Sequence, residues 1–229
     1  MSTADAVISV AALRKQFGGR TVLDDLSFAV ASGEILGLVG ANGGGKTTML
    51  RMLAGLLPPD AGDGSFLGKP LFRRSNRRHL GYMTQRNALY PDLSVAENLA
   101  FRAAVHGIDR ARVAGAAEAY GISDVLGQRV SALSGGWARR VEFVATVFNK
   151  PKLLLLDEPT AGLDVVTRRD MWRWMAALAG EGCAIIVSTH DLIEARQCAN
   201  ILLFTRGKVS GPVVPPARLE DVVIAMAAP

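Results

Sequence analysis

Cysteine, histidine and aromatic side chains are scarce in this sequence. Its 229 residues include two cysteines and three histidines, and 6% of them are aromatic. Cys183 and Cys198 have no cysteine or histidine neighbour at the spacing of a zinc site, which argues against a metal cluster built on thiols. Both lie in or near apolar segments, so we expect buried, unreactive thiols in a reducing cytosol.

Long hydrophobic runs are also missing. The richest ones, ILGLVG, LLLL and AIIV, are far shorter than the roughly 20 apolar residues that span a bilayer. The N-terminal stretch MSTADAVISVAALRK has neither a basic leader nor an uninterrupted apolar segment, so a signal peptide is not indicated. We therefore expect a soluble chain that reaches a membrane only through a partner.

Neither sign of charge dominates strongly. The chain has 26 Lys and Arg against 21 Asp and Glu, and the net charge of +5 is compatible with nucleic acid, anionic lipid or a phosphorylated ligand. It selects none of them. The hydrophobic content of 49% is ample for a sizeable core, and no repeat or low-complexity linker divides the chain. We expect a single domain over residues 1–229.

Short apolar strands alternate with helical patterns along the chain, which indicates an α/β fold. Residues 6–13 and 21–30, separated by Gly18-Gly19, predict a pair of strands. The run EILGLVG predicts another strand, and a loop follows it. The next segment has apolar residues at helical spacing, namely Met49, Met52, Leu53 and Leu56.

The C-terminal part of the chain predicts further strands. Residues 152–158 and 183–190 are continuous apolar runs of the kind that is buried on both faces of a parallel sheet. Residues 201–211 predict a hairpin that turns at Arg206-Gly207. A helix is predicted between the two apolar runs, with one side formed by Met171, Trp174, Met175 and Leu178.

The middle of the chain, residues 86–149, is predicted to be a mostly helical insertion between two parts of a core, residues 1–85 and 150–229. Ser94 and Glu97 have the spacing of a capping box at a helix start. A later apolar stripe at helical spacing comprises Val141, Val144, Ala145 and Phe148.

The segment GANGGGKT, Gly40–Thr47, matches the pattern G-x-x-x-x-G-K-[ST] and lies between a predicted strand and a predicted helix, as this pattern requires. Its glycines let the backbone wrap around a phosphate chain, and the helix start favours negative charge. Lys46 would reach the outer phosphates, and Thr47 would offer its hydroxyl to Mg²⁺. A glycine-rich turn with an exposed lysine is the alternative, which the flanking strand and helix disfavour.

Polar residues at the ends of the two buried strands supply the remaining chemistry. Asp157 would hold Mg²⁺, usually through water, and Glu158 would accept a proton from the attacking water. His190 follows the neighbouring strand and is interpreted as a γ-phosphate contact, with a structural histidine as the alternative. Two solvated acids are the alternative for the acidic pair. Gln85, which follows GYMT, would by itself be an ordinary surface glutamine.

The segment LSGGWARR, residues 133–140, has no acid, thiol or histidine, yet it has the form of a helix start. Ser134 is the predicted cap, and the backbone N–H groups that follow it would attract an anion. The phosphate loop and the acidic pair already hold one face of a nucleotide. A second anion-binding helix start, on an insertion, would therefore face a different nucleotide or the far side of this one, which a second copy of the chain could supply.

Taken together, these segments resemble the ATP-binding-cassette (ABC) ATPases. Gly40–Thr47, Gln85, LSGG, LLLLDEP, AGLD and His190 follow the order and spacing of that family over nearly the whole chain. The resemblance implies a P-loop NTPase fold with a mixed or parallel sheet, an N-terminal antiparallel β part and an inserted helical subdomain. It also implies a head-to-tail dimer with two ATP molecules between the subunits, each held by one subunit's phosphate loop and the other's LSGG signature segment.

The resemblance carries roles to individual residues. Phe17 is similar to the aromatic residue that stacks on adenine, with an ordinary strand aromatic as the alternative. Gln85 matches a glutamine that senses Mg²⁺ and links the site to the membrane partner, and His190 matches a switch histidine. The residues that match the loop for ATP phosphates and Mg²⁺ are Asn42, Gly43, Gly44, Gly45, Lys46, Thr47 and Thr48. Those that match the trans-acting and communicating segments are Ser134, Gly135, Gly136 and Asp164.

Two positions depart from the family pattern. The family usually has glutamine where this chain has Trp137, and alanine where it has Gly44. Because Ser134 and the two glycines after it are present, we expect phosphate binding in trans to persist. Contacts made through residue 137 are expected to differ.

The stretches GYMTQRNALYPDLSVAENLAF and GLDVVTRRDMW resemble the ATPase subunits of bacterial exporters of drugs, antibiotics, polysaccharides or lipids. This resemblance implies a cytoplasmic ATPase, peripheral to the inner face of the cell membrane, that drives a separate integral-membrane permease. It pairs with a second ABC ATPase subunit, for which we expect an identical chain, with a different cassette as the alternative. The alternative is a non-transport ABC ATPase that acts on nucleic acid or the ribosome, supported only by the basic run RRSNRR at 73–78. That run lacks interleaved aromatic residues and is typical of a solvated face, so we expect no nucleic-acid partner. A third alternative, a phosphate-loop kinase or GTPase switch, is disfavoured because it would give the LSGG segment no role.

Overall fold

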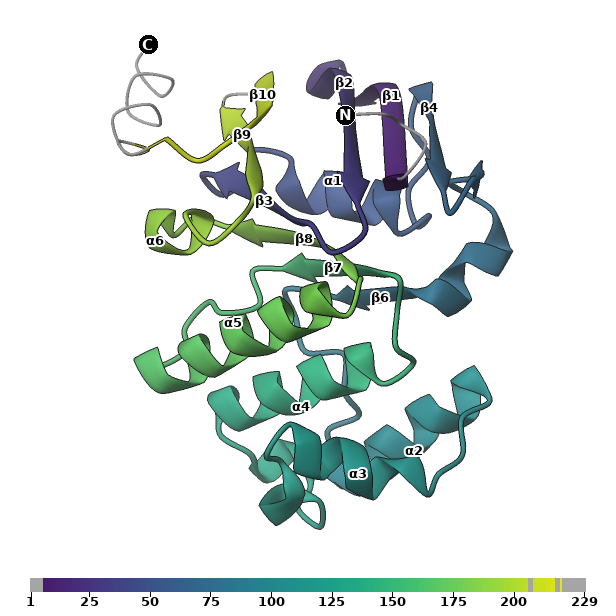
Figure 1. Cartoon of the computed structure of the whole chain (residues 1–229), viewed down its shortest axis with the longest axis vertical. Coiled ribbons are helices and arrows are strands. Elements are labelled where there is room, and N and C mark those ends of the chain that lie inside the picture. Colours follow the sequence, from purple (N-terminus) through teal and green to yellow (C-terminus); the bar gives the residue numbers. More distant parts are fainter. Residues whose placement is uncertain (1–5, 206–207, 217–218, 220–229) are drawn as a thin grey trace.

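Two β-sheets and the helices packed against them make up the computed structural model, which describes residues 6–205, 208–216 and 219 (Figure 1). The first sheet is antiparallel and has the order β2-β1-β4-β5. Its strands are β1 (Ala6–Phe17), β2 (Arg20–Ala31), β4 (Ala61–Phe66) and β5 (Lys69–Pro70). The predicted pair of strands around Gly18-Gly19 is confirmed as β1 and β2.

The second sheet has the order β10-β9-β3-β8-β7-β6. It consists of β3 (Ile35–Gly40), β6 (Leu80–Met83), β7 (Leu153–Asp157), β8 (Ala184–Thr189), β9 (Asn200–Thr205) and β10 (Lys208–Val213). All neighbouring pairs are parallel except β9 and β10. Every residue of β7 and β8 is buried, as their continuous apolar runs predict. The expected turn at residues 206–207 lies outside the described residues.

Helix α1 (Lys46–Leu53) packs between the two sheets. Its Met49 shares one hydrophobic core with Leu13 of the antiparallel sheet and Leu36 of the parallel sheet. Leu56, the last of the apolar residues at helical spacing, lies beyond the end of this helix, and its side chain is 59% exposed. The helix ends at Leu53, and Gly55 at φ 66° turns the chain before Leu56 can continue the helical stripe.

Helix α5 (Val165–Gly180) and the short α6 (Leu192–Ala195) pack on the opposite face of the parallel sheet (Figure 1). The strand β7 shows how the two faces divide, because Leu153 and Leu155 join the core around α1 while Leu154 and Leu156 join the core around α5. This alternation places the end of β7 between two packed layers. The polar residues that follow it are therefore held on a rigid support.

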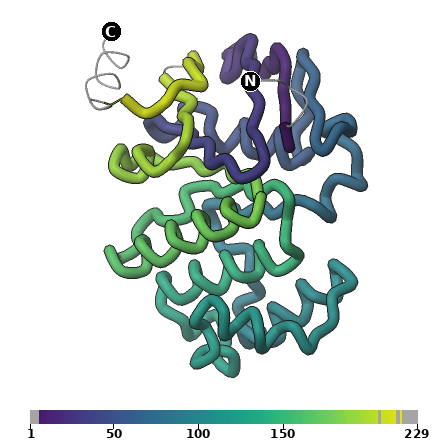
Figure 2. Tube along the Cα trace, viewed as in Figure 1, coloured from purple at the N-terminus to yellow at the C-terminus, as the bar shows by residue number. Residues whose placement is uncertain are grey.

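The helices α2 (Val95–His106), α3 (Arg112–Ala119) and α4 (Gly135–Val147) form the part of the molecule farthest from the antiparallel sheet (Figure 2). They share a hydrophobic core that contains the predicted stripe Val141, Val144, Ala145 and Phe148. The predicted capping box is confirmed, because Ser94 Oγ accepts the Glu97 N–H at 3.2 Å and Glu97 accepts the Ser94 N–H at 2.7 Å. Ser134 is confirmed as the N-cap of α4.

Both cysteines are buried and free of disulfides. Burial raises the pKa of Cys183 to about 11 and that of Cys198 to about 12, so each thiol stays protonated near neutral pH. Among the described residues, no helix combines the length and the apolar character that crossing a membrane requires.

Candidate functional site

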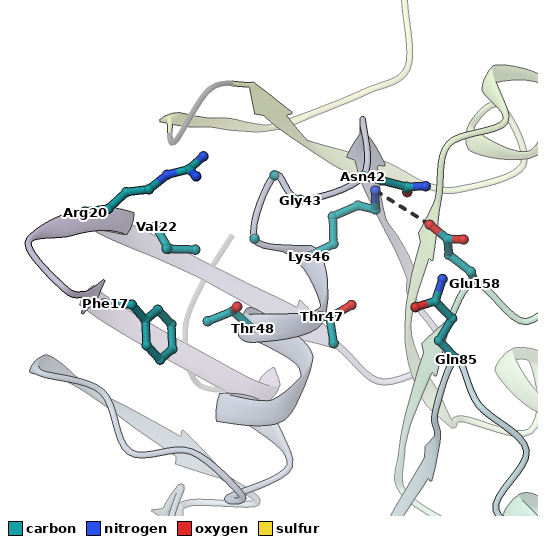
Figure 3. A pocket seen from close by; sticks show the side chains of 12 residues that line it. Phe17, Arg20, Val22, Asn42, Gly43, Lys46, Thr47, Thr48, Gln85 and Glu158 are labelled. Atoms are coloured by element: carbon teal, nitrogen blue, oxygen red, sulfur yellow. Dashed lines mark ion pairs between the residues drawn. The ribbon is translucent and has the colours of Figure 1, made fainter.

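A cavity of about 400 Å³ opens where the two sheets meet, and side chains from four regions of the chain line it (Figure 3). Phe17 and Arg20 come from the β1–β2 hairpin, while Gln85 and Glu158 follow the ends of β6 and β7. The loop between β3 and α1 lies between these two sides. The full lining is Phe17, Arg20, Val22, Asn42, Gly43, Gly44, Gly45, Lys46, Thr47, Thr48, Gln85 and Glu158.

The loop between β3 and α1 follows a path that side chains would obstruct. Gly40 has φ 151°, and a Cβ there would lie 2.2 Å from the carbonyl oxygen of Phe204. Gly45, the N-cap of α1, has φ 107°, and its Cβ would lie 2.9 Å from Val22 Cγ1. No side chain caps α1, so the N–H groups of its first turn remain available to an anion.

Lys46 lies at the start of α1 and is 5% exposed. Its Nζ donates to the carbonyl oxygens of Gly40 at 2.6 Å and Ala41 at 3.1 Å, and it lies 3.8 Å from Glu158 Oε1. Burial lowers the pKa of Lys46, while the charges of Glu158 and Asp157 oppose that shift. A phosphate group would supply the negative charge that favours the protonated form of this amine.

Asp157 ends β7 and is 2% exposed. Its Oδ1 accepts the Ser188 hydroxyl at 2.8 Å. Its Oδ2 is buried and has no hydrogen-bond partner among the residues that the structure describes. A buried carboxylate oxygen without a partner is costly, and a divalent cation or one of its water ligands would satisfy it. The residues present thus fit the Mg²⁺ that the sequence predicts.

Glu158 follows directly and adopts φ 47°, a left-handed conformation that is unusual for a non-glycine residue. Its N–H donates to Ser188 Oγ at 2.9 Å. His190 Nδ1 lies 3.6 Å from Glu158 Oε1, and the histidine side chain is 57% exposed. The structure therefore brings together the acidic pair, the predicted histidine and Lys46, although Asp157 and His190 do not line the cavity itself.

Ser134, Gly135, Gly136 and Asp164 lie outside the cavity lining. They form a second group, since a Cβ on Gly136 would lie 4.0 Å from Asp164 Oδ2. Ser134 caps α4, and Asp164 caps α5 by accepting the N–H groups of Val166 and Thr167, each at 2.9 Å. Hydrogen bonds from the Thr167 N–H and hydroxyl lower the pKa of Asp164.

Trp137 packs within its own subunit. The Arg140 guanidinium lies 5.3 Å from the Trp137 ring centre and 5.4 Å from that of Trp174, and it forms an ion pair with Asp170 of α5. The residue that replaces the usual glutamine thus takes part in fastening α4 to α5.

Two residues with contacts at this site were not singled out by sequence reasoning. Arg20 lines the cavity beside Phe17. The only indication of this in the sequence was its position as a charged residue directly after the Gly18-Gly19 turn. Arg139 donates to the carbonyl oxygens of Asp157 and Glu158, each at 3.0 Å. In the sequence it was visible only as one of two adjacent arginines after LSGG.

Comparisons with known proteins agree with this geometry. Residues 23–161 match the family model described as "ABC transporter". The chain is 37% identical over 211 residues to "Probable multidrug ABC transporter ATP-binding protein YbhF" of Escherichia coli (strain K12), covering 90% of this chain and 36% of that protein. It is 38% identical over 224 residues to "Nod factor export ATP-binding protein I" of Paraburkholderia xenovorans (strain LB400), covering 95% of this chain and 74% of that protein.

Solved structures give the same result. A structure described as the ATP-binding subunit of an ABC transporter matches with a TM-score of 0.84 and 26% identity, over 97% of this chain and 95% of the other. The CbiO1 protein of Clostridium perfringens, part of the ABC transporter complex CbiONQ, matches with a TM-score of 0.83 and 28% identity, over 96% and 93% of the two chains. The chain spans about a third of the multidrug relative and about three quarters of the Nod factor export relative. It belongs to the ABC transporter family and has the P-loop α/β fold of that family's ATP-binding proteins.

Proposed function

We propose that the cavity binds ATP with Mg²⁺ and that its hydrolysis drives transport through a separate membrane permease. The observation that carries this proposal is the meeting of the glycine-rich loop and Lys46 with Glu158 in one cavity, while Asp157 lies beside it with an unpartnered buried oxygen. A polyphosphate and a divalent cation together would satisfy every one of these groups.

Each predicted residue has a role in this proposal. Phe17, 48% exposed at the cavity edge, stacks on the adenine ring. Glu158 accepts the proton of the attacking water, and His190, close to it, contacts the terminal phosphate. The residues that hold the phosphates are Asn42, Gly43, Gly44, Gly45, Lys46, Thr47 and Thr48. Those that hold Mg²⁺, directly or through water, are Thr47, Gln85 and Asp157.

The LSGG segment serves the ATP site of a second copy of the chain. Ser134, Gly135 and Gly136 lie outside the cavity of their own subunit, and a Cβ at Gly135 would meet no neighbouring atom within 4 Å. An uncovered helix start with a serine cap fits phosphate oxygens brought by a partner. Asp164, next to Gly136, then lies at the boundary between the two sites.

The permease docks on residues 86–149, which we propose to be the inserted helical subdomain between core segments 1–85 and 150–229. Tyr90 and Phe101 stack edge to face with ring centres 5.2 Å apart, although their side chains are 50% and 45% exposed. Val105 on the same helix is 61% exposed. This apolar surface begins shortly after Gln85, which lines the cavity, so the docking site and the ATP site are linked through this part of the chain. The chain would then act at the inner face of the cell membrane.

Two of the relatives are named for multidrug transport and Nod factor export, which supports the proposal of an exporter. The alternative of a non-transport ATPase rests on the basic run 73–78. Most of that run lies in the 3₁₀ helix Arg74–His79, and all four of its arginines are exposed. Its buried Asn76 donates to the carbonyl oxygens of Pro70 and Leu71 and so anchors the turn. The similarity to transporter subunits favours transport over that alternative.

The experiment measures ATP hydrolysis by the purified chain and by Lys46→Ala, with Mg²⁺ and with chelator. We expect hydrolysis that requires both Mg²⁺ and Lys46. The tagged chain is then isolated from detergent-solubilised membranes of its own cells, and we expect one integral-membrane protein to accompany it in stoichiometric amount. Ribosomes or nucleic acid in place of a membrane protein would contradict the transport assignment.

A further inference from the structure

One arginine, Arg139, connects the signature helix α4 with both loops that border the ATP cavity. Its side chain is 11% exposed and lies five residues beyond the Ser134 cap, a distance of roughly 7–8 Å along the helix axis. The contacts of its guanidinium group reach the ends of two neighbouring parallel strands, β6 and β7.

All five N–H donors of this guanidinium group have an acceptor. Nη1 donates to the Thr84 carbonyl oxygen at 2.7 Å and to Glu142 Oε2 at 2.9 Å. Nη2 donates to the carbonyl oxygens of Asp157 and Glu158, each at 3.0 Å. Nε donates to the carbonyl oxygen of Pro159 at 3.1 Å. A planar group with five donors in fixed directions holds these acceptors in one arrangement, which a lysine ammonium cannot reproduce.

Glu142 extends the same connection. This carboxylate is 2% exposed, and its second oxygen, Oε1, accepts the Ala88 N–H at 3.0 Å. The loop after β6 is therefore fastened to α4 at Thr84 through Arg139 and at Ala88 through Glu142. Gln85 lies between these two anchors.

We propose that Arg139 is a positioning residue for ATP hydrolysis, which holds Glu158 and Gln85 in place relative to the LSGG segment of the same subunit. This inference rests on the proposed function of the cavity. The guanidinium group touches the main chain of Glu158, so it sets the direction of a carboxylate that it does not contact. Because Ser134 lies on the same rigid helix, the arrangement also ties the segment that serves the partner's ATP to the loops that serve its own.

The test compares Arg139→Lys with Arg140→Lys. Arg139→Lys keeps the positive charge but loses the planar guanidinium group with its five donors. The second changes an adjacent arginine of similar burial whose contacts are Asp170, Trp137 and Trp174 and not the two loops. For Arg139→Lys we expect kcat to fall about 10-fold or more, because displacing a catalytic group by about 1 Å has effects of this size. We expect KM and the Kd for a fluorescent ATP analogue to change less than about 3-fold. Arg140→Lys should keep kcat within about 3-fold.

A second readout does not depend on activity. Hydrogen–deuterium exchange of the nucleotide-free chain should become faster at residues 84–90 and 157–164 in Arg139→Lys, and should stay unchanged there in Arg140→Lys. The proposal is wrong if a folded Arg139→Lys chain keeps its kcat, or if both variants accelerate exchange equally across α4. If the unmodified chain showed no hydrolysis, the proposed function would fail, while the exchange experiment would still decide whether Arg139 fastens the loops.

Discussion

Glu158 combines a strained main chain with a carboxylate at the centre of the site. A left-handed conformation costs a non-glycine residue on the order of 1–3 kcal/mol, so contacts elsewhere must stabilise it. Ser188 of β8 accepts its N–H, and Arg139 of α4 donates to its carbonyl oxygen. The direction of this carboxylate is thus set by the neighbouring strand β8 and by α4, the helix that precedes β7 in the chain.

We predict that Glu158→Gln keeps ATP binding and loses on the order of 10²–10⁴-fold in turnover, as expected when a general base is removed. Glutamine has nearly the same shape as glutamate. The contacts with Ser188 and Arg139 are made by the main chain of residue 158, so they should remain. Steady-state kinetics and binding of a fluorescent ATP analogue measure the two quantities separately. Unchanged turnover would show that another group accepts the proton.

At the scale of secondary-structure elements, α4 and α5 begin side by side with their caps, Ser134 and Asp164, close to Gly136. A helix start offers unpaired N–H groups and a partial positive charge, and both features are strongest within the first turn. At the start of α5 the Asp164 carboxylate already accepts the Val166 and Thr167 N–H groups, whereas at the start of α4 the Ser134 hydroxyl accepts that of Trp137. The start of α4 is therefore the one suited to anionic oxygens that approach from outside the subunit.

We predict that the LSGG segment acts only in trans. A Lys46→Ala chain, which cannot hold ATP properly, is mixed with a Ser134→Arg chain, which places bulk in the partner's site. In the mixed dimer both changes fall on one composite site and leave the other intact, so ATPase activity should exceed that of either variant alone. This requires that subunits exchange and that one intact site turns over.

The matched control for this mixture combines both changes in one chain, since its homodimer has no intact site at all. Full activity of Ser134→Arg chains by themselves, together with ATP-dependent dimers in the mixture, would contradict the trans role.

Periodicity and motif context were sufficient to predict the elements that hold the phosphate loop and the acidic pair. Continuous apolar runs identified β7 and β8, and the cap residues identified the starts of α2 and α4. The strand β4 was not predicted, because its sequence AGDGSF has no apolar alternation and pairs through its main chain with β1. The role of Arg139 depends on strand ends that approach it only after folding, so no local pattern could reveal it.

At the scale of the whole molecule, the surface that we propose for permease docking and the proposed ATP cavity share the loop after β6. Its Ala88 N–H is held by Glu142 of α4, and its Tyr90 N–H is held by Asn98 Oδ1 of α2 at 2.8 Å. A force applied to this loop from outside is therefore passed to two helices and to Gln85. The arrangement suits the proposed relay of nucleotide state to a membrane partner.

We predict that a photo-crosslinker at Tyr90, which is half exposed, joins the chain to a membrane subunit in intact membranes. A crosslinker at Val213 of β10, a comparably exposed residue on the far sheet edge, serves as the matched control and should give no such product. Crosslinking from the β9–β10 region alone would place the permease elsewhere.

The close approach of Gly40 and Phe204 affects how the nucleotide site forms during synthesis. The phosphate loop rests on β9, and its strand β3 pairs on one side with β8 and on the other with β9. The strands β8 and β9 come much later in the chain than the loop, so a ribosome releases the loop well before its two neighbouring strands. A growing chain therefore carries the complete Gly40–Thr47 motif for a long period without the support that shapes it. High-affinity ATP binding should consequently arise late, once residues up to β9 have left the ribosomal tunnel.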